Sequence, residues 1–172
     1  MTNSQTDRAV QLADGQTNPP VLVSASMIRN LASTRLEEIE SRWKPAREQM
    51  AQIREGSEHG HWDWRNKIWS TESGRHRLVA IERCGDVQGL MAILSQPCPT
   101  ALGVEGSPVL YVDYLEVAPW NLKGLPSPPR FLGVGTLLIA EAVRLSSILG
   151  GKGELGSIRY RKPSGFTRRS VR

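Results

Sequence analysis

The chain has 172 residues, a length that suits a single domain with its own hydrophobic core. Lys and Arg outnumber Asp and Glu by 22 to 17, but six of the basic residues and no acidic one lie within residues 159–172. The rest of the chain, with 16 basic and 17 acidic residues, is nearly neutral, which argues against a nucleic-acid-binding body. We therefore assign 159–172 to a basic irregular tail.

Cysteine usage and hydropathy narrow the class of protein further. Cys84 and Cys98 are the only cysteines, and neither belongs to a Cys/His cluster of the kind that holds structural zinc. No apolar run is long enough to span a membrane, and no apolar stretch precedes Val21. These features predict a cytoplasmic protein without a metal site and without a membrane partner.

The N-terminal region divides into a polar segment and the start of a domain. Residues 1–20 are polar and end in two prolines, so we predict that they are disordered. The domain itself is predicted over residues 21–158 and begins with a short edge strand, Val21–Val23. Apolar residues then recur every three or four positions from Ile28 to Trp43, which predicts an amphipathic helix capped near Ser24 or Ser26.

Two features follow that first helix. Pro45 is expected to break or kink it, since proline removes a helical hydrogen bond, and a second helical piece is expected beyond. Next come His59 and His61, flanked by tryptophans. Two histidines two positions apart chelate a metal poorly without a third ligand, so we read the segment as packing residues rather than a metal site.

The middle of the chain reads as three strands. Arg77–Arg83 and Val87–Leu94 are apolar runs joined by Cys-Gly-Asp, a connection typical of a tight hairpin. After a loop rich in proline and glycine comes Val109–Val117, which is rich in β-branched and aromatic residues. Pro119 should end this strand, because proline cannot donate to a sheet ladder.

A helix predicted from Val134 to Leu149 has an apolar stripe, with Glu141 and Arg144 on its opposite face, where they can pair weakly. Its entry, Arg130-Phe-Leu-Gly-Val-Gly-Thr136, places two glycines at a helix N-terminus. Free N–H groups, a partial positive charge and an arginine make such an entry a cradle for a diphosphate. A glycine turn before a core helix is the simpler alternative.

Three phosphate-binding patterns can be compared with this entry. A Walker A loop needs Gly-Lys-Ser/Thr, but Gly135 is followed by Thr136-Leu137. A Rossmann fingerprint needs a third glycine or alanine where this chain has Leu138. The pattern that fits is Arg/Gln-x-x-Gly-x-Gly after a strand ending in Val-x-Pro. In this the chain resembles the GNAT superfamily of N-acetyltransferases over about forty residues, although residues 120–129 lengthen a loop that is usually short in that family.

The resemblance implies an α/β (α+β) fold, with a mixed, mostly antiparallel sheet flanked by helices. It also implies acetyl-CoA as cofactor and acetyl transfer to a primary amine of a small molecule or a protein. Trp62 and Trp64 would fall where the family's second helix borders the acceptor. The cofactor would be bound by Leu115, Val117, Arg130, Phe131, Leu132, Gly133, Val134, Gly135 and Thr136.

A catalytic base would come from the strand that the resemblance places beside the thioester. Asp113 and Glu116 are its carboxylates, and their odd separation predicts that they point to opposite faces of the sheet. We favour Glu116 as the base, because it lies nearer the end where the strands should splay apart. An ordinary ion pair with an arginine is the alternative for this carboxylate.

The resemblance fails after Gly153. The family's fifth strand is barely present, since no apolar strand of normal length follows, and the fourth helix with its acid tyrosine and the last hairpin are missing. Tyr160 is not at a matching position. With suitable synonymous codons, a one-base shift after codon 153 yields a strand-like and then a helix-like peptide. We therefore expect a truncated or frameshifted C-terminus and a poor catalyst, and a natural disordered tail is the alternative. The alternative function is a non-catalytic remnant or binding module whose basic tail contacts nucleic acid or another polyanion, with salt-sensitive affinity.

Overall fold

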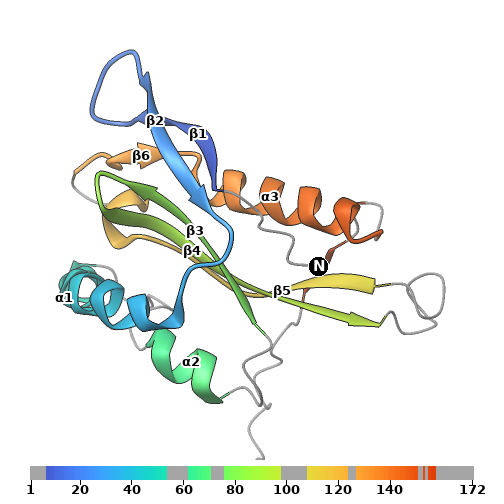
Figure 1. The fold of residues 1–172 in the computed structure, drawn as a ribbon. Coiled ribbons are helices and arrows are strands. Elements are labelled where there is room, and N and C mark those ends of the chain that lie inside the picture. Colours follow the sequence, from blue (N-terminus) through green and yellow to red (C-terminus); the bar gives the residue numbers. More distant parts are fainter. Residues whose placement is uncertain are drawn as a thin grey trace, which may run out of the picture.

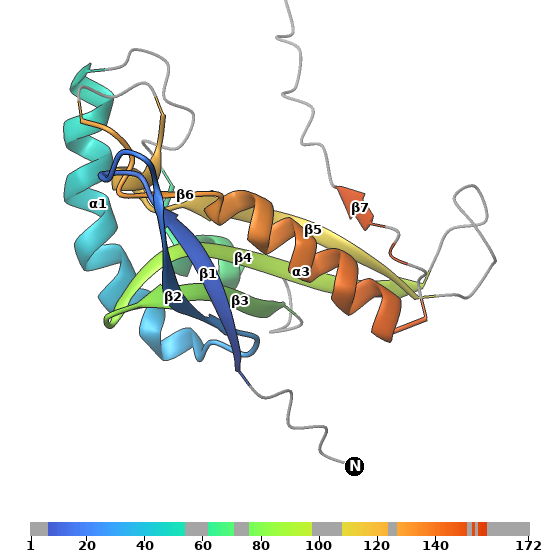
Figure 2. The same cartoon turned by 90° about the horizontal axis from the view of Figure 1, so that it is seen from above.

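In the computed structural model, the described residues are 7–53, 62–70, 76–97, 108–123, 127–150, 153 and 155–157. They form a mixed sheet with helices on both faces (Figures 1 and 2). The elements in chain order are β1 (Arg8–Asp14), β2 (Val21–Ile28), α1 (Leu36–Ile53), α2 (Trp64–Ser70), β3 (Arg77–Arg83), β4 (Asp86–Pro97), β5 (Pro108–Val117), β6 (Phe131–Leu132), α3 (Val134–Ile148) and β7 (Leu155–Ser157).

The strands lie in the order β6-β1-β2-β3-β4-β5-β7, and every neighbouring pair is antiparallel except β5 and β7. The predicted hairpin is present, and its turn holds Cys84 and Gly85 at φ of 51° and 81°. Positive φ at both central residues is the geometry of a type I′ turn, one of the two common two-residue hairpin turns. The strand predicted at 109–117 and the helix predicted at 134–149 also match β5 and α3 closely.

Two hydrophobic clusters fill the two faces of the sheet. On one face α3 packs Leu138, Ala142 and Leu145 against the strands. On the other face α1 and α2 contribute Trp43 and Trp64, which are 1% and 0% exposed. Figure 1 shows α3 on one side of β3, β4 and β5 and α1 and α2 on the other. Two covered faces explain why β3 and β4 read as nearly continuous apolar runs in the sequence.

The N-terminal prediction was wrong for part of its length. Residues Arg8–Asp14 form β1, which pairs with β2 along its whole length. Only Val10 and Leu12 face the core, and they are 7% and 0% exposed. Two buried residues among polar neighbours are too few to predict a strand from the sequence. The backbone hydrogen bonds to β2 stabilise β1 in addition to the burial of these two side chains. Consequently β2 is not an edge strand.

The first helix begins later than predicted. β2 continues to Ile28, with Ala25 and Met27 facing the core, and α1 starts at Leu36 after a short 3-10 turn at Ser33–Arg35. The apolar residues at 23, 25 and 27 follow a period of two, which the helical reading overlooked. α1 then runs through Pro45 to Ile53 without a break.

A buried carboxylate lies on α3, where the sequence predicts an exposed one. Glu141 has no exposed surface, and its Oε1 accepts hydrogen bonds from Nε of Arg29 at 2.7 Å and Nη2 of Arg144 at 2.7 Å. Arg8 Nη2 lies 3.8 Å from its other oxygen. Burial alone would raise the pKa of Glu141, but the hydrogen bonds and charges of Arg144 and Arg29 lower it below its ordinary value.

We predict that Glu141→Ala lowers the free energy of unfolding by about 3 kcal/mol, because it leaves Arg29 buried without its carboxylate. Glu38→Ala is the matched control, since Glu38 is half exposed and its nearest contacts to Arg35 and Arg42 are 3.8 and 3.7 Å long. The control should cost no more than about 0.5 kcal/mol. Urea unfolding of both variants measures this, and equal losses would contradict the assignment.

Stability should also fall on acidification. The folded pKa of Glu141 is depressed, so its contribution is complete above the unfolded value, about 4.3, and is lost as pH falls through the lower folded value. Melting temperatures between about pH 2.5 and 6 should therefore decline less steeply in Glu141→Gln than in the unmodified chain. Parallel curves would mean that other carboxylates carry the acid sensitivity.

Candidate functional site

The start of α3 has the geometry of an anion cradle. Gly133 is its N-cap, at φ of 81°, and Leu137 N–H donates the first helical hydrogen bond to Gly133 O at 3.0 Å. The N–H groups of residues 134–136 therefore have no acceptor within the helix, and they carry its partial positive charge. A Cβ at Gly133 would meet no atom within 4 Å, and one at Gly135 would meet only Val117 Cγ2, at 3.4 Å. The space in front of the glycines is open.

A side-chain network fixes this entry against the sheet. Asn121 Oδ1 accepts a hydrogen bond from Phe131 N–H at 2.8 Å, and Asn121 Nδ2 donates to the backbone and side-chain oxygens of Gln88 at 3.2 and 3.1 Å. Arg130 N–H donates to Trp120 O at 3.0 Å, which closes the loop that the sequence shows as lengthened. Sequence reasoning missed Asn121 and Gln88, because their partners lie on other elements.

Arg130, three residues before Gly133, has an exposed side chain. Its guanidinium carbon is 5.6 Å from the centre of the Trp120 ring, which holds the cation by stacking. An open hollow of about 400 Å³ adjoins it, lined on one side by the C-terminal half of α1, including Met50, and on the other by Pro128. Phe131 and Val134, in contrast, are buried in the α3-side core.

The end of β5 has an uncovered edge among the described residues. β7 pairs only with Leu110–Val112, so residues 113–117 have no described strand beside them on that side. Ala118 N–H donates to Gln88 O on β4. Because N–H groups alternate along a strand, those of Leu115 and Val117 point toward the uncovered edge. Such an edge can pair with an extended ligand.

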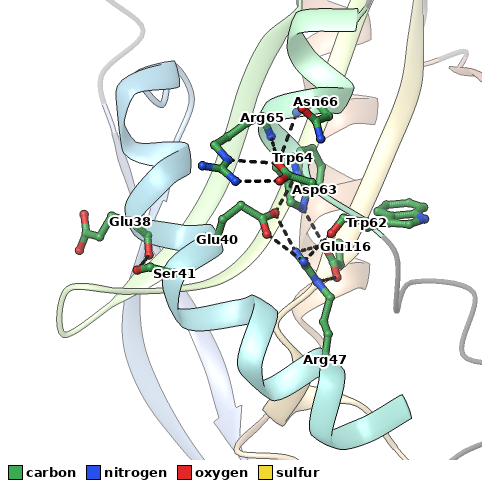
Figure 3. A network of polar contacts seen from close by, with 10 residues as sticks. All are labelled: Glu38, Glu40, Ser41, Arg47, Trp62, Asp63, Trp64, Arg65, Asn66 and Glu116. Atoms are coloured by element: carbon green, nitrogen blue, oxygen red, sulfur yellow. Dashed lines mark hydrogen bonds and ion pairs between the residues drawn. The ribbon is translucent and has the colours of Figure 1, made fainter.

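Glu116 belongs to a buried ion-pair network (Figure 3). Its carboxylate accepts hydrogen bonds from Arg47 Nε at 2.7 Å, Arg47 Nη2 at 3.1 Å and Trp64 Nε1 at 2.6 Å. Arg47 also donates to both carboxylate oxygens of Glu40 at 2.9 Å. Burial alone would lower the pKa of Arg47, but the hydrogen bonds to Glu40 and Glu116 raise it above its ordinary value. Glu116 thus forms an ion pair with an arginine, which was the alternative to a catalytic base in the sequence analysis.

The two tryptophans expected beside the acceptor occupy different environments. Trp64 is fully buried, and its backbone N–H donates to Glu40 Oε1 at 2.8 Å. Trp62 is half-buried, and its ring centre is 6.2 Å from that of Tyr114. Lys67 Nζ lies 4.1 Å from the centre of the Trp62 ring. Of the two, Trp62 is therefore the one that can contact another molecule. His59 and His61 lie outside the described residues.

A β-bulge changes the faces expected for the strand carboxylates. The register of β5 against β4 shifts at Asp113, so that Val112 and Leu115 both pack on the α3 side. Tyr114 and Glu116 consequently face α1 and α2. Asp113 Oδ2 lies 2.8 Å from His76 Nε2, and that ring packs beside Tyr114. The expectation of opposite faces was wrong, because the extra residue resets the alternation.

Metal and membrane features can be stated for the described residues. They contain no group of three or more His, Cys, Asp or Glu side chains that could hold a metal ion. None of the helices in this part of the chain is long and apolar enough to cross a membrane.

Comparison with known proteins yields structural matches alone, since no family model and no curated protein sequence matches the chain. An integron cassette protein from the mobile metagenome of V. cholerae matches with a TM-score of 0.51 and 14% identity, over 80% of this chain and 76% of that one. A transcriptional regulator from Bacillus halodurans C-125 matches with a TM-score of 0.50 and 13% identity, over 81% and 84%.

A ribosomal-protein-alanine N-acetyltransferase from Brucella melitensis biovar Abortus 2308 also matches, with a TM-score of 0.47 and 16% identity, over 81% of this chain and 82% of that one. At such identities a match concerns the fold. The fold class predicted from the sequence, a mixed and mostly antiparallel sheet flanked by helices, is confirmed by the strand order and by the helices on both faces.

Proposed function

We propose that the chain binds acetyl-CoA and transfers its acetyl group to a primary amine. The observation that carries the proposal is the adjacency of an open glycine cradle and an uncovered strand edge. Gly135 lies against Val117, the last residue of β5, and the uncovered edge runs back from there to Asp113. A ligand with an anionic diphosphate and an extended arm that contains amides matches both features at once.

The parts of the cradle have distinct roles in this proposal. The N–H groups of Val134, Gly135 and Thr136 bind diphosphate oxygens, with the positive end of α3 behind them. Arg130 adds a planar fork of donors that suits phosphate oxygens, and stacking on Trp120 limits the positions of its side chain. Gly133, Phe131 and Leu132 shape the turn, and the burial of Phe131 anchors it to the core.

The uncovered edge of β5 positions the reacting group. Leu115 and Val117 offer two N–H groups in the direction away from β4, where they can bind the amide carbonyls of the arm or the thioester carbonyl. Acetyl-CoA supplies an activated acetyl group as a thioester. The amine attacks in its neutral form, so the acceptor side must favour loss of a proton from the ammonium.

A test of the cradle replaces Gly135 with valine. A Cβ at Gly135 meets only Val117 Cγ2, at ordinary contact distance, so the fold should tolerate the change while the side chain blocks the N–H groups. We expect acetyl-CoA affinity, measured by calorimetry, to fall at least about tenfold. Ala140→Val adds comparable bulk at an exposed position of the same helix and serves as the control.

Arg130→Gln should weaken acetyl-CoA binding by about tenfold, which is the loss expected for one charge-assisted contact to phosphate. Lys44→Gln removes the same charge from the exposed face of α1 and should leave the affinity unchanged. If Gly135→Val and Arg130→Gln both bind acetyl-CoA as tightly as their controls do, the glycine turn only connects β6 to α3, and the proposal is wrong.

Glu116 offers a second test, which separates a base from an ion-pair residue. Because Arg47 and Trp64 occupy its carboxylate, we expect Glu116→Gln to lower the stability and to leave the pH dependence of acetyl transfer unchanged. The measurement is a pH–rate profile beside a urea unfolding curve. Loss of the acidic limb of the profile at unchanged stability would instead identify Glu116 as the base.

A further inference from the structure

A lysine lies on the α1 and α2 side of β5, held by two aromatic rings. Lys67 of α2 has its Nζ 4.1 Å from the centre of the Trp62 ring and 4.5 Å from that of Tyr114. The two rings stand at 83° to each other, so the ammonium lies over both faces. Trp62, Lys67 and Tyr114 are all half-buried, so the group is reachable from solvent. We call these three residues the aromatic lysine site.

The aromatic lysine site lies beside the uncovered edge of β5 that we propose binds the arm of acetyl-CoA. Tyr114 belongs to the stretch of β5 whose edge is uncovered, next to Leu115, and three residues before Val117. Three strand residues span about 10 Å. An arm that leaves the cradle at Val117 and follows this edge therefore passes beside Tyr114, and Lys67 approaches the same residue from the face of α1 and α2.

Burial and neighbouring charges change the pKa of Lys67 in opposite directions. Burial lowers the pKa of Lys67 below its ordinary value, while the charges of Asp113 and Glu116 oppose that change. Asp113 is held by His76 at 2.8 Å, and Glu116 by Arg47 and Trp64, so both carboxylates are engaged with other partners. A larger share of neutral amine at a given pH is the condition for nucleophilic attack on a thioester.

We propose that Lys67 is an internal acceptor: the amine held by Trp62 and Tyr114 takes the acetyl group of an acetyl-CoA bound along β5. The inference rests on the proposed function and adds to it a substrate, a lysine amine of the chain itself. An attached amine reacts at a high effective concentration, so this transfer does not require a complete binding site for a separate acceptor.

The chemistry balances without a further reactant. The ammonium first loses one proton to solvent, and the nitrogen lone pair attacks the thioester carbonyl carbon. A C–N bond forms, and the C–S bond breaks as the tetrahedral intermediate collapses. The second proton leaves the nitrogen, and the CoA thiolate is protonated to the thiol. The products are an N-acetylated Lys67 and free CoA, with one proton released in total.

The experiment incubates the full chain with equimolar acetyl-CoA near pH 8 and measures acetylation of each lysine by mass spectrometry of peptides. Lys44 is the internal control, because it is exposed on α1 and reports reaction that needs no bound cofactor. We expect Lys67 to be acetylated at least about tenfold faster than Lys44. The Lys67 rate should rise with pH and level off below the ordinary lysine value, about 10.4.

Two further arms keep the inference separate from the proposed function. Calorimetry with CoA establishes whether the cofactor binds, and Gly135→Val should remove selectivity for Lys67 without changing the rate at Lys44. CoA binding with equal rates at the two lysines overturns the internal acceptor and leaves the proposed function standing. Absence of CoA binding overturns both. In Lys67→Arg, which keeps a cation over the rings, acetylation at position 67 should be lost while CoA affinity stays unchanged.

Discussion

Arg47 is the residue on which the α1/α2 face of the molecule depends. It bridges Glu40 on its own helix and Glu116 on β5, and it also donates to the backbone oxygen of Trp62 at 2.8 Å (Figure 3). All three side chains of the bridge are at most 5% exposed. A buried arginine with both of its carboxylates in place is tolerated, but each partner alone would be a costly buried charge. The network therefore fixes where α1 and the segment before α2 lie against β5.

The opposite face uses the same chemistry at a different place. Glu141 of α3 is buried beneath Arg29 and Arg144, so a carboxylate and an arginine also link a helix to the sheet there. Buried ion pairs add little net stability compared with apolar residues of similar size, because desolvation offsets their attraction. What they add is geometric selectivity, since a helix shifted by one turn would leave a buried charge unpaired. Such pairing suits a sheet that carries helices on both faces.

The sequence predicted those parts of the fold whose signal is local. The hairpin of β3 and β4, strand β5 and helix α3 each carry an apolar pattern and a turn or cap within one segment. β1 was missed because only two of its residues are buried, and its partner is needed to explain it. The bulge at Asp113 has no sequence signature, yet it decides which face two carboxylates share.

The same limit applies to the candidate site. The glycine entry at 133–135 was visible because glycine spacing is a local signal, and its geometry at α3 agrees with an anion cradle. Asn121 was not visible, because its role comes from bonds to Phe131 and Gln88, ten and thirty-three positions away. Lys67 was not visible either, since a lysine in a helix reads as a solvated side chain until the rings that hold it are known.

These elements meet at one place, the last five residues of β5. The cradle adjoins their α3 side through the contact between Gly135 and Val117, while Tyr114 and Glu116 face α1 and α2. Where a strand has a neighbouring strand on each side, the sheet separates its two faces completely. Along 113–117 no strand of the described part of the chain lies beside this edge of β5, and the proposed transfer uses this edge to bring a ligand anchored on one face to a group on the other. The bulge makes that arrangement useful, because it places Tyr114, and with it Lys67, on the face opposite the cradle.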